Sequence, residues 1–231
     1  MRLVRTSAAV SLGLLAVLAP GADAAPKAVA KPVCNLITDT PKDTFLLRSQ
    51  DGQGAYGPQE DGLDILSMDV ASDAKTLTGV VRVAKLATKV QSAPGGIDFR
   101  IGFTLPGQDP TTGNFFLNAR ADSSGAPSFL LGLRTVVAQG QSTTAKLVDA
   151  TGTFDTTKNE VHISVPVSAV KSGSVSLATG SILSFAGLDE TSARQVAVNP
   201  ATGVGTATFA DVTNSETTYK AGTKSCVTPG K

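Results

Sequence analysis

An apolar residue at every second position is the feature of this sequence that most restricts its fold. The clearest example is residues 97–105, where Ile, Phe and Leu side chains alternate with polar ones. Successive side chains of an extended strand point to opposite faces of a sheet, so this run predicts a half-buried antiparallel strand. No segment carries a convincing apolar period of 3.6 residues over three turns, which favours an all-β protein.

Similar runs recur at short spacing along the chain. They predict strands over residues 63–71, 76–86, 114–121, 128–138, 160–167, 174–188 and 206–212, and one strand or a pair of strands over residues 142–154. The alternation slips at Ser67, which predicts a bulge, and residues 166–170 predict a single helical turn. About nine short strands with turn residues between them indicate one antiparallel β-sandwich of jelly-roll or immunoglobulin-like type. We expect this single domain to cover residues 34–226.

The first 24 residues are typical of a secretory signal peptide. Arg2 and Arg5 precede an apolar run over residues 8–19, and Ala22-Asp23-Ala24 forms an A-x-A cleavage site. The apolar run is shorter than the roughly 20 residues that span a bilayer. We therefore expect a secreted, extracellular protein with a disordered lead-in over residues 25–33 and a short tail over residues 227–231.

Two cysteines, Cys34 and Cys226, lie near opposite ends of the expected domain. An exported protein meets an oxidising environment, and two cysteines allow only one intramolecular pairing. The sequence therefore predicts a Cys34–Cys226 disulfide. A redox or metal-binding role is disfavoured because the pair lacks CxxC spacing.

The net charge of the expected mature chain disfavours nucleic acid and anionic membrane as partners. Without residues 1–24 the chain has 18 basic and 18 acidic residues and so no net charge, and no basic run stands out. Nucleic acid and anionic membrane are poor partners for such a surface. We expect a monomer without a membrane span.

Acidic residues concentrate near the start of the expected domain. They are Asp39, Asp43, Asp51, Glu60, Asp61 and Asp64, several of them in a glycine-rich loop. Calcium takes six to eight hard oxygen ligands, so Asp39, Asp43, Asp61 and Asp64 form a candidate calcium site, joined by Asp211 if the two ends of the chain are adjacent. The alternative is a set of solvated turn residues, since Asp and Gly both favour turns. Both interpretations stay open at this point.

The sequence contains few residue patterns that indicate catalysis. The one histidine, His162, stands between Val161 and Ile163 and is expected to face solvent with Glu160 and Ser164. No Gly-x-Ser-x-Gly motif is present, and one histidine does not supply a zinc site. Glu60 and Asp64 are a conceivable carboxylate pair for a hydrolase, but one flexible loop does not fix the separation that such a pair needs.

Aromatic residues offer little to a glycan. The chain has no Trp and two Tyr, and most of its nine Phe fall at expected core positions of strands. Tyr56, inside the glycine-rich loop, is the aromatic side chain expected to be available to a ligand. A loop anchor packed against the sandwich is the equally weighted alternative.

The order of several short motifs resembles a known type of module. The motifs are Asp39-x-x-x-Asp43 after the first Cys, Leu63-Asp64-Ile65, Lys85-Leu86 before Pro94-Gly95-Gly96, Gly152-Thr153-Phe154, Val165-Pro166, Ala210-Asp211-Val212 and Tyr219-Lys220-Ala221-Gly222. This order resembles exported actinobacterial β-sandwich modules of the DOMON and carbohydrate-binding family 9 type, sometimes appended to subtilisin-like proteases. In that family the first motif commonly reads Asp-Pro-x-Gly-Asp, and here Lys42 stands in place of the Gly.

The resemblance implies a non-catalytic binding or accessory module. The expected ligand is a glycan or a protein. Calcium is the expected ion on account of the acidic cluster, whereas Lys42 in place of the family's Gly weakens an ion site inferred from the resemblance. Two alternatives are a structural, surface-associated extracellular protein without a small ligand, and a hydrolase that uses carboxylates.

Overall fold

The computed structural model describes residues 32, 34–44, 59–109, 113–138, 141–185, 191–198, 205–213 and 216–231. Contacts divide the chain after Ala30, and residues Lys31–Lys231 form one compact unit. The expected signal peptide and nearly all of the expected lead-in fall outside the described residues, as do Asp51 and Tyr56.

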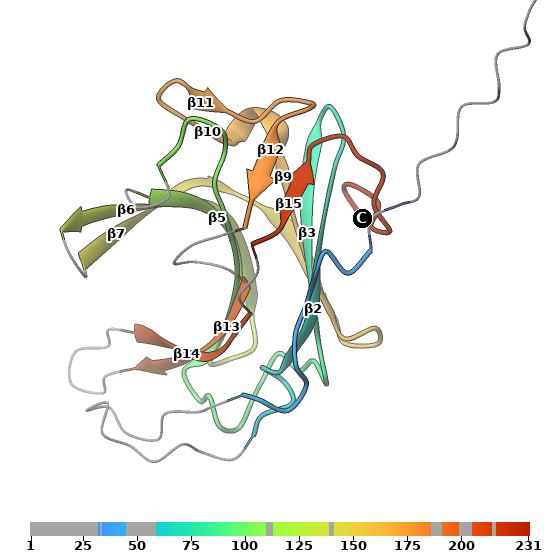
Figure 1. Ribbon diagram of the computed structural model, residues 1–231. Coiled ribbons are helices and arrows are strands. Elements are labelled where there is room, and N and C mark those ends of the chain that lie inside the picture. Colours follow the sequence, from blue (N-terminus) through green and yellow to red (C-terminus); the bar gives the residue numbers. More distant parts are fainter. Residues whose placement is uncertain are drawn as a thin grey trace, which may run out of the picture. The chain divides into compact units, whose positions relative to one another are not determined.

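Two antiparallel sheets form the body of this unit (Figure 1). The five-stranded sheet has the order β1 (Ile37–Thr38), β2 (Ile65–Ser72), β3 (Thr76–Val83), β9 (Glu160–Pro166) and β8 (Thr151–Asp155). The six-stranded sheet has the order β14 (Gly205–Thr213), β13 (Thr191–Val198), β4 (Gly96–Phe103), β5 (Gly113–Asp122), β6 (Pro127–Ala138) and β7 (Gln141–Asp149). Two small ribbons pair β10 (Lys171–Ser172) with β11 (Val175–Ser176) and β12 (Ile182–Ser184) with β15 (Thr218–Lys220). The prediction of an all-β antiparallel sandwich is confirmed.

The core lies between the apolar faces of the two sheets. Leu77, Val81, Ile101 and Leu117 are among its fully buried members. Gly79 in β3 is required for this packing, because a Cβ atom there would lie 2.5 Å from Ile101 Cδ1 and 2.9 Å from Leu117 Cδ1 on the facing sheet. Alternation in the sequence thus produces two apolar faces, and the lack of a side chain at Gly79 lets them approach closely.

The strand over residues 97–105 was expected to be buried on one face only, and this prediction is wrong. On the face of the six-stranded sheet away from the core, Asp98, Phe116 and Asn118 are also buried. The Arg100 guanidinium lies 4.0 Å from the centre of the Phe116 ring, and Asn118 donates a 2.9 Å hydrogen bond to Asp98. A cation–π contact and a hydrogen-bonded polar pair therefore occupy a face that the sequence pattern assigns to solvent.

Several finer predictions are confirmed. The bulge lies between Ile65 and Ser67 of β2, and residues Val167–Ala169 form the helical turn η1, of 3₁₀ type. The segment 142–154 divides into β7 and β8.

Other predictions about the strands are wrong. Instead of one strand over residues 174–188 there are the short strands β11 and β12. The long strand β13 was missed, since Thr191, Ala193 and Gln195 on its core side are small or polar and give no apolar alternation.

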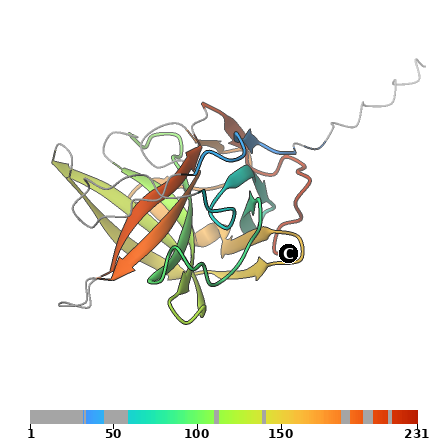
Figure 2. The same cartoon turned by 90° about the horizontal axis from the view of Figure 1, so that it is seen from below.

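The two ends of the domain meet on the outer side of the five-stranded sheet. Cys34 and Cys226 form the predicted disulfide, with their Cα atoms 5.1 Å apart. The red C-terminal segment lies beside this sheet in both views (Figures 1 and 2). The disulfide closes a loop with a sequence separation of 192 residues, which is nearly the whole domain.

Removal of this disulfide is predicted to destabilise the domain strongly. Closing a loop of that length removes entropy from the unfolded chain worth up to about 5 kcal/mol. We expect the C34S/C226S variant to unfold at a clearly lower urea concentration than the oxidised wild type. Wild type treated with reductant is the matched control and should behave like the variant. Equal midpoints for all three samples would contradict this account.

Candidate functional site

Three of the predicted acidic residues meet at one end of the sandwich. The carboxylates of Asp39, Asp43 and Asp211 each place an oxygen atom within 4.8 Å of the other two. Asp39 and Asp43 follow β1, whereas Asp211 lies on β14 near the other end of the chain. The predicted condition for Asp211 to join the cluster, adjacency of the two ends, is therefore met in the fold.

The backbone around Asp39 is fixed by β2. Asp39 N–H donates a 3.0 Å bond to the Leu66 carbonyl, which continues the pairing of β1 with β2. Its own Oδ1 accepts a 2.9 Å bond from Thr40 N–H. The other oxygen, Oδ2, is buried and has no hydrogen-bond partner within the described part of the chain. A buried oxygen of this kind requires a donor or a cation.

Asp64 holds the turn between the two cluster residues. Lys42 adopts a left-handed backbone (φ 70°), and its N–H donates to both oxygens of the fully buried Asp64 carboxylate at 2.9 and 3.0 Å. Asp64 was predicted as a metal ligand, but it is outside the group of three. Its observed contact is with the turn that carries Asp43, which makes it a positioning residue.

Asp211 ties β14 to the start of β2. Its Oδ2 accepts a 2.6 Å hydrogen bond from Ile65 N–H, and only 2% of the residue is exposed. Asp211 pairs with Ala193 on the neighbouring strand β13. Because Ala193 is a core residue, Asp211 also points to the core side of the sheet. The carboxylate of Asp211 is thus enclosed between the edges of both sheets.

Burial and like charges change the acidity of the cluster. The pKa of Asp211 is raised to about 7: burial is the largest cause, the Ile65 hydrogen bond opposes it, and the nearby charges of Asp39 and Asp43 add to it. Burial also raises the pKa of Asp39, with the charges of Asp43 and Asp64 acting in the same direction. Such a group of carboxylates either retains a proton or binds a cation.

The remaining predicted residues are not brought into this group. Asp61 is exposed, and the contact described for it is made by its main-chain carbonyl, which accepts from Lys85 N–H at 3.0 Å. Glu60 accepts bonds from Gly62 N–H and the Ser92 hydroxyl at 3.2 and 2.5 Å. Asp51 and Tyr56 lie outside the described residues, so their predicted roles stay predictions.

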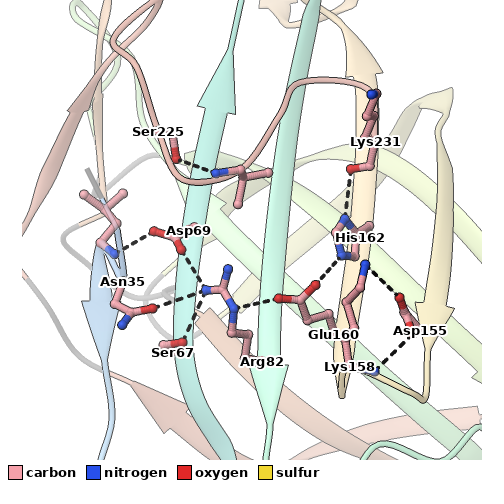
Figure 3. A network of polar contacts seen from close by, with 12 residues as sticks. Asn35, Ser67, Asp69, Arg82, Asp155, Lys158, Glu160, His162, Ser225 and Lys231 are labelled. Carbon is pink, nitrogen blue, oxygen red and sulfur yellow. Dashed lines mark hydrogen bonds and ion pairs between the residues drawn. The ribbon is translucent and has the colours of Figure 1, made fainter. Parts of the chain in front are cut away.

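A second polar cluster was not predicted (Figure 3). On the outer face of the five-stranded sheet, Arg82 bonds to Asp69 at 2.7 Å and to Glu160 at 2.8 Å. Glu160 also contacts His162 Nε2 at 2.9 Å. Burial would lower the pKa of Arg82, but its bonds to Asp69 and Glu160 outweigh that effect and raise it. The bonds from His162 and Arg82 likewise lower the pKa of Glu160 against the effect of burial.

Part of this cluster was detectable in the sequence. Residues two apart on a strand share a face, so Glu160 and His162 were predicted to lie together, and they do. His162 is not solvent-facing as predicted, because only 17% of its side chain is exposed and the C-terminal segment lies over it. The contribution of Arg82 depends on the pairing of β3 with β9, which no local pattern specifies.

Comparisons with known proteins identify no relative. No family model, no curated protein and no solved structure matches this chain. Within the residues that the structure describes, no helix has the length and apolar character needed to cross a membrane.

The acidity of Asp211 leads to a pH prediction. Its pKa of about 7 in the folded protein lies above its ordinary value of 3.8, so the folded state holds a proton that the unfolded chain releases. The stability contributed by this group is therefore fully present below about pH 4 and is lost as the pH rises to about 7.

The test is urea unfolding at several pH values in the presence of a chelator. In D211N the neutral amide oxygen can still accept from Ile65 N–H, and this decline between pH 4 and 7 should be smaller than in wild type. An identical pH profile for the two proteins would contradict the assignment.

Proposed function

We propose that this chain is a secreted, non-catalytic β-sandwich module that binds one calcium ion at Asp39, Asp43 and Asp211. The observation that carries the proposal is the convergence of these three carboxylates from opposite ends of the chain. The disulfide is compatible with an oxidising extracellular environment. The resemblance in motif order to exported accessory modules supports the non-catalytic assignment.

The chemistry of the ligands favours calcium over other metals. The cluster consists of carboxylates alone, and hard oxygen ligands suit calcium, magnesium or manganese rather than zinc. Magnesium demands near-ideal octahedral geometry, whereas calcium accepts irregular sets of six to eight oxygens. Asp211 is buried and Asp43 is exposed, so an ion here has protein on one side and water on the other.

Two buried oxygens on the described residues add support. Asp39 Oδ2 has no hydrogen-bond partner there, and the same is true of Thr213 Oγ1. Thr213 lies two residues after Asp211 on β14, so both side chains point to the same face of the sheet. A cation with its bound water would satisfy oxygens that the described protein groups leave unpaired.

The ion would serve the fold at a defined place. The segment after β1 pairs with the five-stranded sheet, and β14 is an edge strand of the six-stranded sheet. A cation bound to both would join the two sheets at this end, and it would remove the repulsion among three neighbouring carboxylates. The proposed role of calcium is therefore stabilisation of the module rather than chemistry.

Thermal unfolding with calcium and with chelator tests the proposal. A ligand at 100 times its Kd adds about 2.7 kcal/mol to the stability of the folded state. At roughly 2–4 °C per kcal/mol, wild-type Tm should rise by several degrees.

The D43N substitution replaces an exposed carboxylate of the cluster by a neutral amide, and the variant should lose most of the calcium-dependent rise in Tm. D61N is the matched control, because it makes the same charge change at an exposed position outside the cluster and should respond like wild type. Equal Tm values for wild type with and without millimolar calcium would refute the calcium site.

A further inference from the structure

Strand β7 forms one edge of the six-stranded sheet, and among the described strands none pairs with its outer side. Every residue of β7 except Val148 is exposed. Apart from the ladder to β6, the hydrogen bonds described for β7 are internal and join Lys146 to Asp149. Because alternate residues of an edge strand direct their N–H and C=O groups away from the sheet, about half of this backbone faces outward.

The hairpin of β6 and β7 extends beyond the core. Thr135, Val137 and Ala138 of β6 are exposed, and in both views the hairpin ends far from the five-stranded sheet (Figures 1 and 2). Val137 is 59% exposed and Leu147 is 38% exposed, so the hairpin carries two of the four large apolar side chains that are exposed in the described part of the chain. A two-stranded ribbon is at best marginally stable in water, and a further strand would stabilise it.

The features that normally prevent pairing at an edge are weak on β7. Proteins protect edge strands by making them short or by adding proline, unpaired lysine or bulges. Strand β7 has 9 residues and no proline, and the ammonium of Lys146 lies 2.9 Å from Asp149 of the same strand. Register shifts flank a regular stretch, in which residues 142–146 pair one to one with residues 132–136. This regular stretch is suited to accept another strand.

A second copy of this chain is the partner that fits this edge best. Its own β7 is already extended, whereas a free peptide loses backbone entropy when it is ordered as a strand. Lys146 and Asp149 are the charged residues of β7, and their charges cancel. Two copies of the strand therefore approach each other without net repulsion.

Antiparallel pairing about a two-fold axis at Thr144 is self-complementary. Thr144 lies at the centre of the regular stretch and would face Thr144 of the second copy. Thr143 would then face Ala145. Ser142 would face Lys146, so no two like charges lie directly opposite each other. Each copy uses the same strand in this arrangement, which closes the assembly after two chains.

The other edges of the two sheets are less open. Strand β14, at the opposite edge of the six-stranded sheet, is tied to the five-stranded sheet by the 2.6 Å hydrogen bond from Ile65 N–H to Asp211. The edge strands of the five-stranded sheet, β1 and β8, have 2 and 5 residues. Pairing through β7 therefore favours a dimer over a filament.

We propose that β7 is a dimerisation edge: two copies of this chain pair β7 with β7 in antiparallel orientation about Thr144 and join their six-stranded sheets into one. The expected monomer is then the form present at high dilution. The dimer would present two modules to one partner, which raises avidity for a repetitive ligand without any new contact. The pairing is at the opposite edge of the sheet from β14 and does not depend on the proposed calcium site.

Sedimentation equilibrium over a series of protein concentrations tests self-association. Wild type should be a dimer at high concentration and dissociate on dilution. T144E and T144K each place like charges opposite each other at the two-fold axis, and each should weaken association by about tenfold or more. An equimolar mixture of the two variants places opposite charges there and should restore the dimer. T135K is the matched control, because Thr135 is also exposed but lies on β6, and it should associate like wild type.

Disulfide trapping tests the register. Directly opposite residues of an antiparallel pair have Cα atoms about 4.5–5.5 Å apart, which is within the range that a disulfide spans. T144C should therefore form a covalent dimer under mild oxidation. T157C, in the exposed turn between β8 and β9, is the control and should stay monomeric.

Three results would overturn the proposal. One is wild type that sediments as a monomer at every concentration up to millimolar. Another is a dimer that T144E and T144K both leave unchanged, because its interface must then lie elsewhere. The third is equal covalent dimer formation by T144C and T157C, which would exclude pairing about Thr144.

Discussion

Burial of two alternating apolar faces against each other is the constraint on which the rest of the structure depends. The sheets are antiparallel, and every second residue of their central strands enters the shared core. Gly79 allows Ile101 and Leu117 to approach β3 closely, which sets the separation of the layers at this point. Once the layers are placed, the segment after β1 and the edge strand β14 meet, and so do their carboxylates.

Local pattern was sufficient to predict the strands that bury an apolar face. Residues 97–105 and 160–167 alternate cleanly, and they correspond to β4 and β9. Local pattern was insufficient for β13, where Thr191 and Gln195 are buried beside other strands without being apolar. It was also insufficient for the far face of β4, because Asp98 is buried there beside a polar partner, Asn118 of the neighbouring strand β5. Polar residues that are buried through contacts with polar partners produce no apolar periodicity in the sequence.

The candidate site was predictable in its chemistry but not in its membership. Acidic residues near a turn indicated hard-oxygen ligation, and Asp211 was included on the condition that the ends meet. Asp64 lies outside the group of three, and its carboxylate accepts from the N–H of Lys42, whose left-handed backbone the sequence did not indicate. The cluster around His162 required knowledge of strand order, since Arg82 and Glu160 become neighbours only when β3 pairs with β9.

The disulfide also determines how the domain responds to mechanical force. Cys34 precedes β1 and Cys226 follows β15, so the strands that the structure describes lie within the loop closed by the disulfide, whose two Cα atoms are 5.1 Å apart. Tension applied through the residues before Cys34 and after Cys226 passes along the sulfur–sulfur bond and bypasses both sheets. Under such a load the oxidised domain acts as an inextensible link, and only residues 227–231, beyond Cys226, can be pulled away from the sheet.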